Sequence, residues 1–120
     1  MATTKVVTAI FQATSVAASG TTTTAAVTID DGYGAALGIK ITNGATGPTV
    51  AGQCQIEVSQ DNSEWFNFGG PLVGALGNNV ITSWGGVDIP IGVEYLRLTA
   101  GSNTDQAVVW NADISEVTAV

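Results

Sequence analysis

Histidine is absent from this 120-residue sequence, and cysteine occurs once, at Cys54. Without histidine the chain cannot form a Ser-His-Asp or Cys-His catalytic system, and it lacks the side chain that most often acts as a general base near neutral pH. A single cysteine excludes both an intrachain disulfide and a cysteine-based metal cluster. Cys54 alternates with Ile56 and Val58, which predicts a small core residue and not a nucleophile. The sequence therefore predicts that the protein is not an enzyme and has no catalytic residues.

Charged side chains are also scarce, because they make up 11% of the chain against about 25% in ordinary globular domains. Ten carboxylates face only Lys5, Lys40 and Arg97, which gives a net charge of −7. This is the wrong sign for a protein that must neutralise phosphates, so we expect no nucleic-acid partner. No apolar run approaches the length of a membrane span, so we expect no membrane partner either.

The pattern that is present is the period-two alternation of β-strands, and no convincing helix is found. The predicted strands cover 4–12, 22–29, 36–42, 52–59, 65–68, 80–84, 94–99 and 106–117, with a loose Ser/Ala connection over 13–20 and a loop or short edge segment over 71–76. The fold class expected is all-β, a single β-sandwich of jelly-roll or immunoglobulin-like type with about seven to nine antiparallel strands. Residues 1–120 form one domain in this interpretation, with residues 1–5 as a possible N-terminal arm.

Two hairpins are predicted in the second half of the chain. The polar tip 60–64 leads into a returning arm over 65–68. The strands 94–99 and 106–117 are expected to pair as a terminal antiparallel hairpin, with Leu96, Leu98, Val108 and Trp110 in the core. Alternation also predicts that Trp65 points inward, as Trp110 does.

The candidate interaction residues lie at the N-terminus and at two aromatic positions. Tyr33 stands between glycines, and Trp84 precedes Gly85-Gly86, so both are expected at the surface; Thr3, Thr4 and Lys5 belong to the possible arm. Oxygen donors occur in two turns, at Asp30, Asp31, Asp61, Asn62 and Glu64, and such groups suit calcium, but their spacing does not match an EF-hand. The prediction for metals and for other cofactors is therefore none.

Two segments resemble parts of small tailed-phage virion structural proteins. One is the hairpin from Gln55 to Trp65, and the other runs from Glu94 to Thr104 and continues through Trp110 to the ending Ile114-Ser115-Glu116-Val117. The resemblance is greatest to head decoration proteins, also called cement or auxiliary capsid proteins. It implies a partner, the major capsid protein, a location on the capsid surface of the virion, and a homo-oligomer, with a homotrimer favoured.

Two other functions fit the same sequence. A carbohydrate-binding or receptor-binding β-sandwich module would present an exposed aromatic platform, for which Trp84 and Tyr33 are the candidates. A head-tail connector or tail component of a bacteriophage would form rings instead of trimers.

Overall fold

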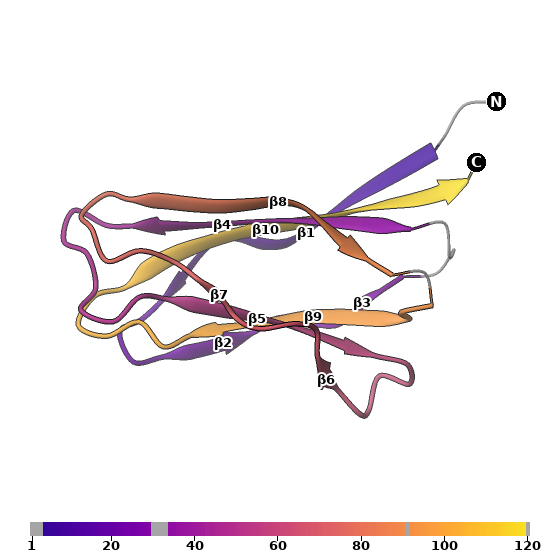
Figure 1. Ribbon diagram of the computed structural model, residues 1–120, viewed down its shortest axis with the longest axis horizontal. Coiled ribbons are helices and arrows are strands. Elements are labelled where there is room, and N and C mark those ends of the chain that lie inside the picture. Colours follow the sequence, from indigo (N-terminus) through magenta and orange to yellow (C-terminus); the bar gives the residue numbers. More distant parts are fainter. Residues whose placement is uncertain (1–3, 30–33, 91, 120) are drawn as a thin grey trace.

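The computed structural model describes residues 4–29, 34–90 and 92–119, with the side chains of residues 6–29, 34–90 and 92–117. Its strands form two antiparallel sheets that pack face to face (Figure 1). Sheet A has the order β1 (Thr4–Val16), β10 (Val108–Ala119), β4 (Ala35–Asn43) and β8 (Ile81–Ile89). Sheet B has the order β2 (Thr21–Thr23), β9 (Tyr95–Gly101), β5 (Gln53–Ser59) and β6 (Phe66–Asn67). Two short strands complete sheet B, since β3 (Val27–Thr28) pairs with β9 and β7 (Leu72–Val73) pairs with β5.

The topology is that of a jelly roll. Strands β2 and β3 share one edge of β9, and β6 and β7 share one edge of β5, so the ten strands fill four positions in each sheet. Along the chain the path crosses repeatedly between the sheets, and strands that are neighbours in one sheet are distant in sequence. The predicted all-β sandwich is confirmed, and this strand order selects the jelly roll from the two types expected.

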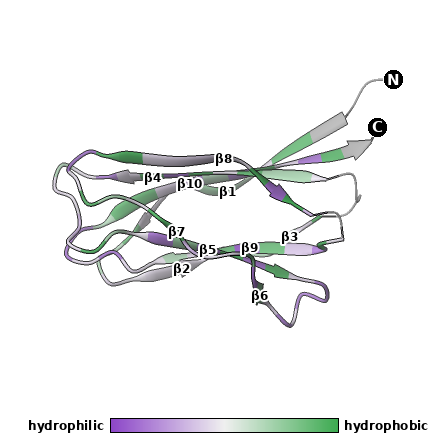
Figure 2. Ribbon diagram, in the orientation of Figure 1, coloured by the Kyte–Doolittle hydropathy of each residue, from purple (hydrophilic) through white to green (hydrophobic). Residues whose placement is uncertain are grey.

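Alternation along each strand builds the core. In β4 every second residue is buried, and the inward set includes Leu37, Ile39 and Ile41. The neighbouring strand β10 contributes the fully buried Trp110 and Ile114 to the same core. The centroid of the Trp110 ring lies 6.5 Å from that of Phe11. Figure 2 shows that the turn between β5 and β6 is hydrophilic, in contrast to the hydrophobic residues along the strands. The apolar side chains therefore fill the space between the sheets.

The predicted terminal hairpin is wrong, although its four core residues are right. Leu96, Leu98, Val108 and Trp110 are all buried. However, β9 belongs to sheet B and β10 to sheet A, so the two strands face each other across the core and do not pair. Both edges of each strand are already occupied, because β9 pairs with β2 and β5 while β10 pairs with β1 and β4.

Strand β1 runs further than predicted. The sequence favoured a loose connection from residue 13, whereas β1 continues to Val16. It does so through register shifts against β10, one of them around Ala13, whose φ is +44°. The Ala13 amide donates to Oδ1 of Asn111, at 2.9 Å, which replaces a lost backbone partner. β8 is likewise longer than predicted and contains a bulge at Gly86, whose φ of +64° suits glycine.

Candidate interaction surfaces

The predicted interaction residues are dispersed over the fold. Thr3 and Tyr33 lie outside the described residues. Thr4 and Lys5 are the first residues of β1 and pair with Ala119 and Val117 of β10, so this part of the possible arm is strand. The structure brings none of the described members of the set together with Trp84, which lies on β8 at the opposite edge of sheet A.

Trp84 is half-buried and packs against the hydrophobic core. Its backbone pairs with Ile39 of β4, so the side chain joins the inward face of sheet A. A flat aromatic platform needs one ring face open to solvent, whereas Trp84 is partly covered by the core; it is also one of the residues that line a depression on sheet A.

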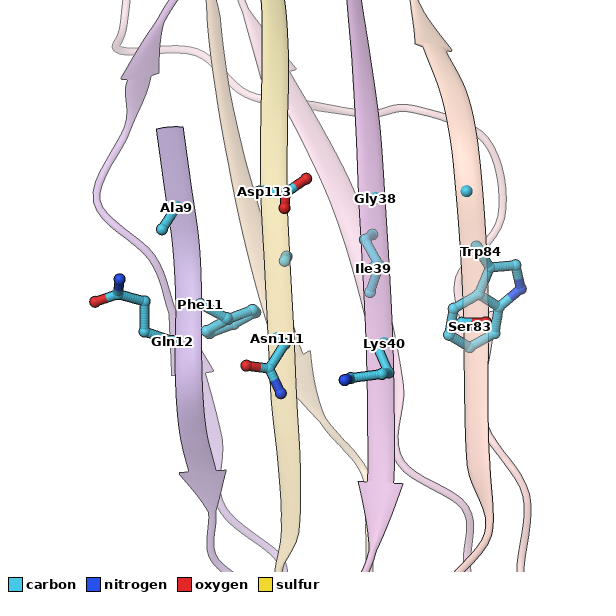
Figure 3. Close-up of a pocket in the computed structure, with 12 residues that line it drawn as sticks. Ala9, Phe11, Gln12, Gly38, Ile39, Lys40, Ser83, Trp84, Asn111 and Asp113 are labelled. Carbon is cyan, nitrogen blue, oxygen red and sulfur yellow. The ribbon is translucent and has the colours of Figure 1, made fainter. Parts of the chain in front are cut away.

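The outer face of sheet A carries a shallow depression of about 470 Å³ (Figure 3). Gly38 leaves room there because it has no side chain, and Asp113 lies opposite it on β10. Two residues further along β4, on the same face, Lys40 lies opposite Asn111. The rim is completed by Gln12 of β1 and Ser83 of β8. The depression is open to solvent, and its lining combines charged, amide and hydroxyl side chains with apolar ones.

The outer face of sheet B carries a connected polar cluster that the sequence analysis missed. Nε of Arg97 donates to Oε1 of Glu57 at 3.0 Å, and the Thr99 hydroxyl donates to the same oxygen at 2.7 Å. The Arg97 guanidinium lies 4.2 Å from the centroid of the Trp65 ring, a cation–π contact. Trp65 is therefore only half-buried and lies under Arg97 on the outer face, so the prediction that it points inward is wrong.

Beside this cluster a polar groove of about 330 Å³ runs along the same face. Hydroxyl and amide side chains line it, together with Pro71: Thr21, Gln53, Gln55, Thr99 and Ser102. Alternation could have found it, because the polar positions of 53–57 and 97–101 recur every second residue and share one face of adjacent strands. What the sequence does not reveal is that these two strands are neighbours.

The oxygen donors considered for calcium are partly engaged by their own turn. Oδ1 of Asp61 accepts hydrogen bonds from the backbone amides of Ser63 and Glu64, both at 2.9 Å. The Glu64 and Ser63 amides, in that order, lower the pKa of Asp61, although the side chain is exposed. Asp30 and Asp31 lie outside the described residues. Within the described part of the chain, no cluster of three or more His, Cys, Asp or Glu side chains could hold a metal ion.

Cys54 is fully buried, as predicted from its alternation with Ile56. Burial raises the pKa of its thiol to about 12. The thiolate is thus disfavoured, which agrees with a packing role. Separately, none of the described residues forms a helix long and apolar enough to cross a membrane.

Comparison with known proteins gives a likeness of fold. No protein-family model matches the chain, and no curated protein sequence does. Among solved structures, the VP2 subviral particle of infectious bursal disease virus superposes with a TM-score of 0.59 and 12% identity, over 95% of this chain and 33% of that one. The chain therefore spans about a third of the viral chain. The SPBc2 prophage-derived protein YomS superposes with a TM-score of 0.55 and 15% identity, over 97% of this chain and 96% of that one.

A third neighbour is a family 16 carbohydrate-binding module, with a TM-score of 0.50 and 9% identity over 88% of this chain and 80% of that one. The strand order places the chain in the class of jelly-roll β-sandwiches. Within that class, its neighbours include a chain of a virus particle and a prophage-derived protein of nearly the same extent.

Proposed function

We propose that this chain is a non-enzymatic structural protein of a bacteriophage virion, a decoration protein that binds the outer surface of the capsid and stabilises the head. Several copies associate as a homo-oligomer, and the major capsid protein is the partner. The observation that carries the proposal is that almost the whole chain forms one jelly roll, which matches a prophage-derived protein end to end and a virus-particle chain in part.

The surface supports this assignment. Long charged side chains lose about 1.5–2 kcal/mol of rotamer freedom when an interface fixes them, whereas short side chains lose much less. Charged residues are 11% of this chain, and among the exposed strand positions that the structure describes only Lys40, Asp88 and Asp113 are charged. A surface of this kind favours permanent packing against neighbouring proteins.

Binding to capsids tests the proposal. Purified protein is mixed with empty capsids of the phage whose genome encodes the chain, and co-sedimentation and the thermal stability of the heads are measured. We expect saturation at a fixed ratio of this chain to the capsid subunit and a higher melting temperature of the decorated head. Absence of co-sedimentation at micromolar concentration would refute the proposal, and binding confined to the tail or its connector would favour the ring-forming alternative.

The polar groove on sheet B favours one alternative, a carbohydrate-binding module. Its amide and hydroxyl side chains are the groups that hydrogen-bond sugar hydroxyls, although no exposed aromatic ring lines it. A panel of neutral oligosaccharides tests this function directly. Gln53→Ala, inside the groove, should abolish any binding, and Gln60→Ala, an exposed glutamine in the β5–β6 turn, is the matched control.

A further inference from the structure

The charges of this protein are unevenly distributed along the chain. The first 29 residues contain one charged side chain, Lys5, and no carboxylate, so all ten carboxylates follow residue 29. Strands β1, β2 and β3 lie within this segment. We call the surface formed by residues 4–29 the acid-free side.

These strands also occupy one side of the sandwich. β1 is the outermost strand of sheet A, while β2 and β3 are the outermost strands of sheet B. Only residues 17–20 connect β1 to β2. Four extended residues reach about 14 Å, and crossing from one sheet to the other takes about 10 Å, so both edges must lie on the same side.

The opposite side is acidic. Asp88 is exposed on β8, the other outermost strand of sheet A, and Asp61 and Glu64 are exposed in the turn before β6. Several carboxylates adjoin the acid-free side. Asp113 and Glu116 are one strand inward, Glu94 lies beside β3, and Asp105 follows the turn in which Asn103 bonds residues 16–19. Asp30 and Asp31 directly follow Ile29 in the sequence. Since the molecule carries a net charge of −7, contact between copies through strands that carry no carboxylate brings fewer like charges together than contact through β8, which exposes Asp88.

The acid-free side also has exposed apolar side chains and a strand edge left unpaired by the described residues, which are typical of a surface that binds another chain. Val6 and Val7 of β1 are 46% and 66% exposed. From Lys5 to Ala9 the strand pairs with β10 without interruption, and no strand among the described residues pairs with its outer edge. Backbone amides and carbonyls on such an edge can pair with another chain.

The size of this side is sufficient for a stable contact. The 13 residues of β1 extend about 43 Å, and two sheets about 10 Å apart with their side chains are about 20 Å thick. The side thus offers on the order of 800 Å², similar to what each partner buries in a standard interface. We infer that copies of this chain associate through the acid-free side, which faces the symmetry axis of the homo-oligomer. The inference rests on the proposed assembly of several copies.

Matched substitutions on the two edges of sheet A test the inference. Val7→Asp places a carboxylate on the acid-free side, and Ile81→Asp places one on β8, where Ile81 is 60% exposed. Ser15→Glu, at an exposed position of β1, is a second variant in case Val7→Asp fails to fold. Light scattering without capsids measures the mass, and circular dichroism checks the fold. This design separates failure of self-association from failure of capsid binding.

We expect the unsubstituted chain and Ile81→Asp to have a multiple of the 12.1 kDa monomer mass, and both β1 variants to shift toward 12.1 kDa. A monomeric unsubstituted chain at high concentration, or an equal loss of mass in Ile81→Asp, would overturn the inference. Hydrogen exchange of the unsubstituted chain gives a readout that needs no variant. Amides of β1 and β2 should gain protection as concentration rises while those of β8 do not, and the reverse pattern would also overturn it.

Discussion

Asn103 offers a demanding test of how the two sheets are held together. It lies between β9 and β10, where the chain crosses from sheet B to sheet A, and it is fully buried. Its Nδ2 group donates to the carbonyl oxygens of Val16, Ala17 and Gln106, at 3.2, 3.3 and 2.9 Å. The Asn103 side chain therefore links the end of β1 to the segment that connects β9 with β10.

Replacing Asn103 with alanine removes the donor and leaves these carbonyls behind. The bond to Val16 is buried, and the other two are partly buried. A buried polar group without a partner costs about 1–3 kcal/mol, and partly solvated groups cost less. Allowing for a small cavity, Asn103→Ala should lower the free energy of unfolding by about 3 kcal/mol, which corresponds to about 10–15 °C in melting temperature for a domain of this size.

Urea unfolding, followed by circular dichroism and by tryptophan fluorescence, measures this loss; coincident transitions support the two-state analysis. The control is Asn78→Ala, because Asn78 is exposed and accepts a single hydrogen bond, from the Gly47 amide at 2.8 Å. It should cost less than about 1 kcal/mol. If Asn103→Ala loses no more than the control, the crossing is not held by this side chain and the argument fails.

Three further predictions follow from local geometry. Gly47→Ala should strongly destabilise the fold, because a Cβ there would overlap the Leu76 carbonyl oxygen, whereas Gly70→Ala, with open space around it, should be nearly neutral in the same urea titration. Folding lowers the pKa of Asp61, so its contribution is present above the unfolded pKa of about 4 and is lost as pH falls through the folded value. Asp61→Asn should therefore be less stable than the unsubstituted chain at pH 7, and the difference should shrink as pH falls below about 4; a difference that stays constant as the carboxyl is protonated would refute the linkage. Cys54, with its thiol pKa raised to about 12, should resist a thiol reagent at pH 8 until urea unfolds the chain, and rapid labelling of the folded protein would show that the site opens.

Local patterns predicted the strands well, because the alternation of apolar residues in segments such as β4 and β5 depends only on which face is buried. The pairing of strands could not be predicted from such local patterns. The short turn after β9 favoured a hairpin, but in the structure that turn carries the chain across the core, held by the buried Asn103. Nothing in a turn rich in Gly, Ser and Asn distinguishes a reversal within one sheet from a crossing between two.

The surface residues were harder to predict for the same reason. Trp65 was expected inside because large aromatic residues in alternating segments usually are. Its actual position under Arg97 depends on the pairing of β5 with β9, which sets Arg97 opposite Glu57. These residues are 40 positions apart in sequence. Their contact follows from topology, which the sequence patterns did not determine.

The segregation of charge connects the fold to assembly. In a jelly roll, the first strands of the chain form the outer edges of both sheets on one side, so the composition of the N-terminal quarter fixes the chemistry of a whole lateral surface. Here the first 29 residues, which contain these strands, include Lys5 as their sole charged residue. In the proposed homo-oligomer, contact through this surface brings fewer like charges together than contact through β8, where Asp88 is exposed. The proposal thus assigns the contact between copies to this lateral surface and leaves the polar outer face of sheet B to a different partner.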